Sequence, residues 1–470
     1  MVPLDRIGKL SFQEQQDEYL KGAPVLAKQA LLNALDGRSP QQLERISFST
    51  CTGYPPGPTI GTYLAEELGL RANIEIINLT GQGCFPSGHN IVCIDGMRDI
   101  ANIKPGTQVL GHDGNFHRVT KVFMRKYLGK VVKIETYSLP PMTVTPEHPL
   151  FIIRSKTRNR EIYKPTTQRW GEDKKIDWTP RWQRADMVHY GDYLLLPRVH
   201  YPTIYSLKVS DFVDLSMAKK PFNAVPDDLL SLPFVRLCGL YLAEGNASKE
   251  GGIQFSLGES ETELIEEIVA TLKGAGLRPL VRPNRGSSGT AKSVRVRVAS
   301  VVLARLFLLW FGKGAKNKQI PNWVFQLNDN LKRSFIDAAW AGDGTQGKKG
   351  VTYKTASKTA AEQIFLLLHT ISEPATLHAG RNYGFSTNMQ YTVSLHHGKK
   401  KRRLWYLDNK YLWIPIKTVS SENYAGLVHN LEVQGINSYV CNLVSAHNCE
   451  AAFPGLRTSY DFVVSRPGAI

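Results

Sequence analysis

The 470-residue sequence has no run of about 18 apolar residues, so no segment is predicted to span a membrane. Its first residues, MVPLDRIGKLSFQEQQ, also lack the apolar stretch of a secretory signal peptide. These two absences predict a cytoplasmic protein with no membrane partner. At this length two to four domains are expected rather than one core.

Cysteine is scarce: there are six, and no two of them form a Cys-x-x-Cys pair, which argues against a zinc ribbon. In a reducing compartment, scattered cysteines are either small buried residues or nucleophiles. Cys93 and Cys441 lie inside strand-like apolar runs and are predicted to belong to the core. Cys84 and Cys449 lie where the sequence pattern changes, which makes them candidate nucleophiles.

Acidic residues are outnumbered, with 41 Asp and Glu against 58 Lys and Arg, for a net charge of +17. A charge of this size favours a polyanionic partner, most commonly a nucleic acid. The alternative is a basic protein that is simply soluble.

The pattern of the chain changes four times. Residues 1–83 alternate helix and strand, with helices at 26–39 and 59–70 that are expected to end near glycines and a strand at 74–79. Short strands joined by Asp-Gly turns fill 84–204 and return at 411–448. Mixed α/β sequence with basic segments occupies 205–410, and 449–470 is helical in character. We therefore expect an α/β protein that is interrupted by a β domain, which is itself interrupted by a basic α/β domain.

The ends of segment 84–448 carry residues suited to self-excision of a peptide. The thiol of Cys84 can attack the preceding carbonyl and convert the Gly83–Cys84 amide to a thioester. Cys449 can then accept the acyl group, and the side chain of Asn448 can cleave the Asn448–Cys449 bond by forming a succinimide. An S-to-N shift would leave a normal Gly83–Cys449 peptide bond. No cofactor is required.

Further residues of types that assist such steps are present. Thr145 and His148, in a Thr-x-x-His pattern after a strand, would place a hydroxyl to polarise the first carbonyl and an imidazole to protonate the departing amine. His447 adjoins Asn448 and can assist its cyclisation. Each motif alone is weak, but their order along the chain fits a single reaction.

At these residues the chain resembles the intein family over 84–448. CFPSGHNIVCIDG, VTPEHPLF and VHNLEVQGINSYVCNLVSAHNC resemble the N-terminal, second and C-terminal blocks of that family. The resemblance implies an all-β, horseshoe-shaped Hint fold. Two residues depart from the pattern, since Asn430 stands where Asp is common and Asn437 where His is common. The departures predict slower or reassigned late-step catalysis.

Two central stretches share one form: LCGLYLAEG from Leu237 and IDAAWAGDG from Ile336. Each is compatible with a helix that has small residues on one face and ends in an acid followed by glycine. The small residues Cys238, Gly239, Ala338 and Ala339 would let two helices approach, so that Glu244 and Asp343 emerge side by side. Two such carboxylates suit Mg²⁺, which could support phosphodiester cleavage. The alternative is a pair of core helices with no ligand.

This pair resembles the LAGLIDADG (DOD-type) homing endonuclease motifs, and the two starts lie 99 residues apart. KNKQIPNWVFQLN, between them, resembles the Lys-x-Ile-Pro block of that family, which implies that Lys318 is the catalytic-site lysine. The resemblance covers roughly 205–410. It implies a pseudo-two-fold α/β saddle that places β-ribbons in the major groove of double-stranded DNA, with the intein-less allele of the host gene as target. The basic stretches 154–164, 292–300 and 396–406 fit DNA contact.

Removing 84–448 joins LTGQG to CEAAFPGLRTSYDF, and the result resembles a type III polyketide synthase (chalcone-synthase-like, thiolase superfamily). In that family this cysteine is the acyl-accepting nucleophile at a helix N-terminus, which implies that Cys449 would serve in splicing first and in acyl transfer afterwards. A complete synthase of this type is expected to be a homodimer. The family's downstream His and Asn are absent, so the ligated product is expected to be incomplete.

The sequence thus predicts a multidomain chain: an all-β Hint domain in two parts (84–204 and 411–448), an inserted α/β LAGLIDADG endonuclease (205–410), and α/β thiolase-like fragments at 1–83 and 449–470. The predicted function is self-splicing together with site-specific cutting of double-stranded DNA. Two alternatives stay open. One is a polyketide synthase fragment with an inactive insertion, and the other is Hint autoprocessing without ligation.

Overall fold

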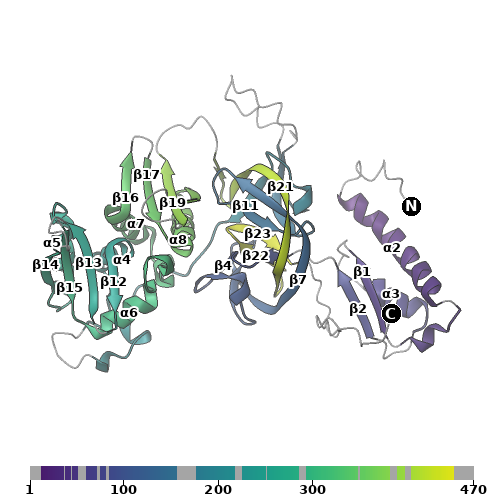
Figure 1. Ribbon diagram of the computed structural model, residues 1–470, viewed down its shortest axis with the longest axis horizontal. Helices are drawn as coiled ribbons and strands as arrows, with labels where there is room; N and C mark the ends of the chain where they lie inside the picture. Colours follow the sequence, from purple (N-terminus) through teal and green to yellow (C-terminus); the bar gives the residue numbers. More distant parts are fainter. Residues whose placement is uncertain are drawn as a thin grey trace, which may run out of the picture.

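The computed structural model describes residues 12–35, 37–43, 45–50, 60–70, 75–80, 84–155, 176–217, 225–249, 251–284, 293–347, 350–381, 389–396 and 404–448. The protein is mixed α/β with large antiparallel sheets (Figure 1). Among the described helices, none combines the length and the apolar character that a bilayer crossing requires.

The N-terminal part is a small βαβ unit with a preceding helix. The helices are α2 (Phe12–Leu35) and α3 (Ile60–Glu67), with a 3-10 turn η1 (Pro40–Gln42). Strands β1 (Arg45–Thr50) and β2 (Glu75–Thr80) pair in parallel. The expected glycines follow both helices in the left-handed conformation, with φ of 80° at Gly37 and 58° at Gly69.

The central part is a 13-stranded sheet whose strands come from both sides of the predicted nuclease insertion. Its N-terminal strands are β3 (Phe85–Pro86), β4 (Asn90–Cys93), β5 (Gly96–Asp99), β6 (Gln108–Leu110), β7 (Phe116–Thr136), β8 (Met142–Val144), β9 (Pro149–Ser155), β10 (Ile176–Arg184) and β11 (Tyr193–Pro197). Its C-terminal strands are β20 (Tyr406–Leu407), β21 (Tyr411–Val433), β22 (Ser438–Cys441) and β23 (Val444–His447). The buried Cys93 and Cys441 belong to its core, as predicted.

Two long strands hold this sheet together, where the sequence suggested shorter ones. β7 and β21 pair antiparallel along most of their lengths. Tyr127 lies opposite Gly426 and Tyr424 opposite Gly129. Each ring also folds over the glycine two residues ahead in its own strand. Aromatic cover of strand glycines lets both strands continue where a turn was expected.

The remaining part repeats one unit twice. Helix α4 (Leu232–Glu244) leads into β12 (Gly245–Ser248) and β13 (Gly252–Gly258), then α5 (Thr262–Gly274), β14 (Leu280–Asn284) and β15 (Ser293–Val298), and α6 (Val301–Phe311) follows. Helix α7 (Asp329–Asp343) leads likewise into β16 (Gly344–Gly347), β17 (Gly350–Thr355), α8 (Lys358–Thr370), β18 (Thr376–Arg381) and β19 (Met389–His396). The strand orders, β12-β13-β15-β14 and β16-β17-β19-β18, are equivalent (Figure 1). Short 3-10 helices complete the structure: η2 (Ile100–Asn102), η5 (Ala185–Met187), η6 (Val209–Asp211), η7 (Leu215–Met217), η9 (Ala315–Asn317) and η10 (Asn322–Gln326).

Helices α4 and α7 approach each other closely through small residues. A Cβ atom added to Gly239 would lie 2.3 Å from the carbonyl oxygen of Phe335 and 2.8 Å from Cβ of Ala338. A Cβ added to Gly342 would lie 2.6 Å from Cβ of Ala243. The predicted small-residue contact therefore exists, and it brings the ends of the two helices together.

Gly239→Ala is expected to destabilise this part by about 1–3 kcal/mol, because the new methyl group must push the helices apart. Gly274→Ala is the matched control, since no atom lies within 4 Å of its added Cβ and alanine favours helix. A urea titration followed by tryptophan fluorescence measures the difference. Equal midpoints for the two variants would contradict the close contact.

Candidate functional site

The upstream end of segment 84–448 is held by a reciprocal pair of hydrogen bonds. The backbone N–H of Cys84 donates to Oγ1 of Thr145 at 2.8 Å, and the N–H of Thr145 donates to the carbonyl oxygen of Cys84 at 3.0 Å. The Thr145 hydroxyl thus lies at the nitrogen of the Gly83–Cys84 amide. The expected contact was with the carbonyl of Gly83, which lies outside the described residues.

The Cys84 thiol is buried, with 1% of the residue exposed. Burial raises the pKa of Cys84 to about 11, and Arg125 opposes the rise through its charge and a side-chain hydrogen bond. Arg125 is a candidate residue that the sequence did not single out, because it lies in β7 within an ordinary basic strand pattern. It is positioned here by β21, since Val428 pairs with both Arg125 and Pro86.

Arg125→Leu is expected to slow thiol-induced cleavage before Cys84 by about tenfold for each unit by which the pKa of Cys84 rises further. The reason is that removing the guanidinium leaves burial unopposed, so that less thiolate is present at any pH below that pKa. Arg125→Lys, which keeps the charge, is the control and should retain part of the rate. Cleavage rates followed over pH check this, and an unchanged rate in Arg125→Leu would contradict it.

His148 is fully buried beside the same cysteine segment. Its backbone N–H donates to the carbonyl of Thr145 at 3.1 Å, which closes a tight turn. Its ring packs edge-on against Phe85, with ring centroids 4.6 Å apart. The Thr-x-x-His pattern therefore places both side chains beside the residues that follow the upstream bond.

The downstream end is held by a second set of contacts. Nδ1 of His447 donates a hydrogen bond to the carbonyl oxygen of Asn448, which is the carbonyl of the bond to Cys449. The N–H of Asn448 donates to the carbonyl of Asn437 at 2.8 Å, and its Nδ2 donates to Oδ1 of Asn437 at 3.3 Å. Asn437 therefore orients the nucleophilic amide. Cys449 itself lies outside the described residues.

A second imidazole lies close to this end. Nδ1 of His112 and Oγ of Ser438 are 2.6 Å apart. The ring of Trp182 packs edge-on against both imidazoles, with its centroid 5.3 Å from that of His112 and 4.9 Å from that of His447. Burial lowers the pKa of His447, its bond to Asn448 opposes the fall, and His112 adds to it. Neither His112 nor Trp182 was singled out as a site residue from the sequence.

Asn430, the other residue that departs from the intein pattern, is buried and makes structural hydrogen bonds. Its Oδ1 accepts hydrogen bonds from the N–H of Leu431 and from the hydroxyl of Tyr439, both at 2.8 Å. The Tyr439 ring in turn lies 6.3 Å from Phe85 and 6.2 Å from His148. Asn430 thus holds the ring of Tyr439 in place beside Phe85 and His148 at the upstream end.

One sheet carries both ends. β3, which follows Cys84, pairs with β21 through Phe85 and His429. β23, which precedes Asn448, pairs with β9 through Ala446 and Leu150. Because β9 follows the Thr145 turn directly, the segment around Thr145 and His148 connects the two ends.

A separate group of charged side chains lies where α4 and α7 end. Glu244 and Asp343 are the last residues of these helices, and Gly245 and Gly344 follow them with the same φ of −87° and ψ of 148°. Burial and the neighbouring Asp343 raise the pKa of Glu244 to about 7, and burial also raises the pKa of Asp343. The two predicted carboxylates are therefore close together and compete for ionisation.

Lys318, which the family resemblance implied for the same site, lies beside these two acids. Its Nζ donates to the carbonyls of Tyr241 at 2.6 Å and Leu242 at 2.8 Å, in the last turn of α4. Burial lowers its pKa to about 8, while Asp343 and Glu244 oppose the fall. An ammonium group that can lose its proton near neutral pH therefore lies beside two carboxylates.

The pair fits a Mg²⁺ ion, which proteins commonly bind through one or two carboxylates with water and phosphate oxygens as the other ligands. Among the described residues, no cluster of three or more His, Cys, Asp or Glu side chains offers a self-sufficient metal site. Glu244 and Asp343 would therefore hold a hard cation only together with a substrate that supplies further oxygens.

Exposed basic side chains follow the strands of both repeated sheets. In β15 the arginines 295 and 297 are exposed while Val296 and Val298 are buried, as the alternating pattern predicted. Arg282 of β14 pairs opposite Arg295 and is also exposed. The second sheet carries exposed Lys354 and Arg381. Most of the basic stretches 154–164 and 396–406 lies outside the described residues.

No protein-family model matches the chain. It is 28% identical over 424 residues to an uncharacterized protein of Methanocaldococcus jannaschii, covering 81% of this chain and 52% of that protein. It is 23% identical over 455 residues to the ATP-dependent DNA helicase Hel308 of Thermococcus kodakarensis, covering 84% and 38%. It is 28% identical over 401 residues to an iron-sulfur cluster assembly SufBD family protein of Mycobacterium tuberculosis, covering 79% and 43%. The chain thus spans about half the length, or less, of these relatives.

Solved structures of homing endonucleases are similar to a part of the chain. I-WcaI bound to its DNA recognition sequence has 15% identity and a TM-score of 0.27, covering 35% of this chain and 75% of that chain. I-DmoI in complex with DNA and manganese has 13% identity and a TM-score of 0.25, covering 35% and 88%. The similarity is limited to about a third of this chain.

Proposed function

We propose that the chain is a self-splicing precursor that excises 84–448 and joins Gly83 to Cys449. The observation that carries the proposal is the hydrogen bonding at the two ends of one sheet. Thr145 accepts from the amide nitrogen of Cys84, and His447 donates to the carbonyl of Asn448. Both contacts are made to atoms of the two bonds that splicing must break.

At the upstream bond the Cys84 thiolate attacks the carbonyl carbon of Gly83. The C–S bond forms, the C–N bond breaks, and the amine of Cys84 takes up a proton. A hydroxyl already at that nitrogen can relay the proton, and the Arg125 guanidinium favours the thiolate that the burial of Cys84 disfavours. His148 would be the proton source on the buried side.

At the downstream bond the Nδ2 of Asn448 attacks its own main-chain carbonyl carbon and expels the amine of Cys449. The imidazole N–H of His447 is already on that carbonyl oxygen and would stabilise the negative charge that develops there. Oδ1 of Asn437 accepts from the attacking Nδ2 and would orient it toward the carbonyl carbon. The proton that Nδ2 loses would end on the departing amine of Cys449, so Asn437 would supply orientation rather than proton transfer.

The relatives support an inserted element. They include proteins of different kinds: a helicase, an iron-sulfur cluster assembly protein, an RNA polymerase subunit and a transcription initiation factor. Each of these proteins is longer than the segment it shares with this chain. A shared segment inside hosts of different function is typical of an element that removes itself and leaves each host intact.

Comparing wild type with Cys84→Ala tests the upstream step. Wild type should release segment 84–448 as a separate band on a denaturing gel, whereas Cys84→Ala should leave the bond after Gly83 intact. Release by Cys84→Ala at the wild-type rate would refute the thioester route. Autoprocessing without ligation would release the same segment, so the other product must be weighed as well.

We further propose that the repeated α/β part cuts double-stranded DNA. The observation that favours it is the grouping of Glu244, Asp343 and Lys318 between two sheets that expose arginine and lysine. Mg²⁺ held by the two acids would supply activation of water and stabilisation of the leaving oxygen. Lys318 would hold or deliver a proton there, and the basic strands would bind phosphates.

Incubation with plasmid DNA tests the cutting activity. The plasmid should carry the coding sequence of the joined Gly83–Cys449 junction, and Mg²⁺ should be present. Linearisation of this plasmid, but not of one interrupted at the junction, is expected. No nick or break in either plasmid would defeat this half of the proposal.

The domain boundaries, the host protein and its location are also part of this proposal. We propose that 1–83 and 449–470 are host fragments, that 84–204 with 411–448 form the splicing domain, and that 205–410 form the nuclease. The βαβ unit at β1–α3–β2 agrees with an α/β host. A polyketide-synthase-like host, its homodimer and a cytoplasmic location are parts of the proposal.

A further inference from the structure

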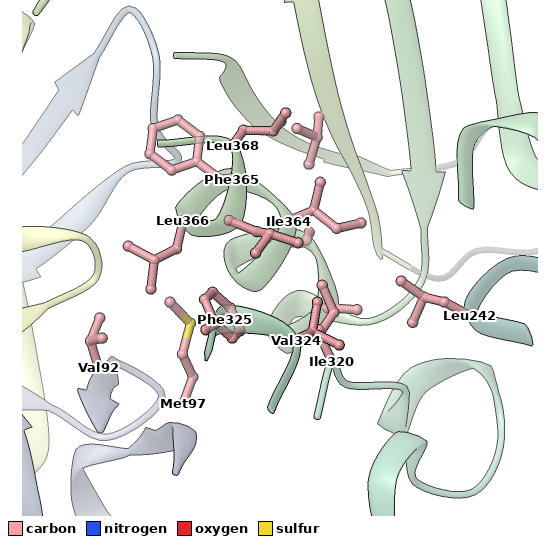
Figure 2. Close-up of a cluster of buried hydrophobic side chains, with 14 of the residues drawn as sticks. Val92, Met97, Leu242, Ile320, Val324, Phe325, Ile364, Phe365, Leu366 and Leu368 are labelled. Carbon is pink, nitrogen blue, oxygen red and sulfur yellow. The ribbon is translucent and has the colours of Figure 1, made fainter. Parts of the chain in front are cut away.

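Helix α8 belongs to the repeated α/β part in sequence but packs against the splicing domain as well. All of its residues from Ala360 to His369 are buried. Figure 2 shows the helix side chains Ile364 and Leu366 in one cluster with Val92 and Met97 of the 13-stranded sheet. The contact is therefore a continuous core between the two parts.

Two hydrogen bonds also join α8 to the splicing domain within this apolar interface. Oε2 of Glu362, whose residue is 3% exposed, accepts from Nδ2 of Asn90 at 2.6 Å. The ammonium of Lys358 donates to the carbonyl of Gly88. The same ammonium lies 3.7 Å from Oε1 of Glu362, and this pairing offsets the cost of burying the carboxylate. The other oxygen, Oε2, remains bound to Asn90 and holds Asn90 against α8.

Asn90 in turn holds the turn that leads to the downstream splice bond. Its N–H donates to Oδ1 of Asn442 at 3.0 Å, and its carbonyl accepts from the N–H of Asn442 at 2.8 Å. Asn442 and Leu443 both have positive φ, 48° and 63°. Leucine rarely adopts this conformation, so the turn depends on its surroundings. β23 starts at the next residue and ends beside Asn448.

We propose that Glu362 is a positioning residue for cleavage at Asn448, acting through Asn90 and the Asn442 turn. The inference rests on the proposed splicing function and deepens it. It means that one helix of the nuclease part stabilises the splicing geometry. The neighbouring Gln363 makes its hydrogen bonds to a different segment: its Oε1 accepts from the N–H of Ile320 at 2.7 Å and its Nε2 donates to the carbonyl of Ile320 at 2.9 Å. Gln363 thereby fixes the segment that carries Lys318.

The test separates the two splice steps. Downstream cleavage is followed alone in a Cys84→Ala chain, and thiol-induced upstream cleavage alone in an Asn448→Ala chain. Glu362→Ala is expected to slow the downstream step by about tenfold, because a buried hydrogen bond that holds the turn is lost. It should leave the upstream rate unchanged, and Glu362→Gln should restore the downstream rate because its amide oxygen can still accept from Asn90.

Two further variants keep the test decisive. Gln363→Leu, at an equally buried position of the same helix, reports general loosening of α8 and should leave downstream cleavage near its original rate. Asn442→Gly keeps the left-handed turn but removes the Oδ1 link, and should slow the downstream step even if Glu362→Ala does not fold. Unchanged rates in Glu362→Ala or Asn442→Gly, or equal slowing by Gln363→Leu, would overturn the inference. Absence of any cleavage in the otherwise wild-type chain would instead overturn the proposed function and the inference with it.

Discussion

Replacing Asn448 by alanine is expected to abolish cleavage of the bond to Cys449, a loss of more than about 10³-fold, because the side-chain amide that attacks this carbonyl within the same residue is removed. The structure has already placed the imidazole of His447 on the carbonyl and Asn437 against the attacking amide. These groups have nothing to assist once the side-chain amide is gone. Intact-mass analysis over time should show only species in which 84–448 is still joined to the C-terminal segment.

The same variant should still form the upstream thioester. Added thiol should therefore release 1–83 from Asn448→Ala at the rate seen without the mutation, because Cys84, Thr145 and Arg125 are not altered. Asn437→Gly is the graded control, since it removes the acceptor for Nδ2 while glycine keeps the left-handed backbone (φ 50°), and it should slow downstream cleavage by about tenfold. Downstream cleavage by Asn448→Ala at a measurable rate would mean that another group carries this step.

Asp343→Asn and Glu244→Gln are each expected to reduce DNA cutting by about 10²–10³-fold, because each removes one negative oxygen from a two-carboxylate site. Splicing should proceed as in wild type, since neither acid lies in the 13-stranded sheet. Glu267→Gln is the matched control: it removes a carboxylate from the same part of the chain, where Glu267 pairs with Arg236 on the surface. Cutting by the control should be unchanged.

The pH dependence of cutting follows from the same side chains. The pKa of Glu244 is raised to about 7, so its carboxyl becomes protonated below that pH and loses affinity for a cation. The pKa of Lys318 is lowered to about 8, so its charge is lost above that pH. Cutting should therefore be greatest between about 7 and 8. Its acid limb should move to lower pH as Mg²⁺ is raised, because bound cation favours the carboxylate. An acid limb that does not respond to Mg²⁺ would contradict the metal role of Glu244.

Much of the fold was readable from local patterns. Glycines 37 and 69 end helices, the strands around Cys93 and Cys441 are buried, and residues 293–298 alternate as a half-buried strand. The length of β7 and β21 was not readable. Their continuity depends on cross-strand pairing between residues about 300 positions apart, which a local window of sequence does not contain.

The residues of the candidate sites likewise fall into two groups, those that a local sequence motif predicted and those that no motif predicted. Thr145, His148, His447 and Asn448 stand in short ordered motifs, and Glu244 and Asp343 each end a recognisable helix. Arg125, Trp182 and Glu362 stand in no motif, because their roles come from strands and helices that meet only in the folded chain. Asn437 was read as a weakness, yet it holds both amide nitrogens of Asn448.

Intact-mass analysis of the freshly expressed wild-type chain tests the central claim most directly. Splicing predicts two products: segment 84–448 ending in a succinimide, and a single peptide in which Gly83 is joined to Cys449. Detection of 1–83 and 449–470 only as separate peptides, or of an unprocessed chain of 470 residues, would contradict it.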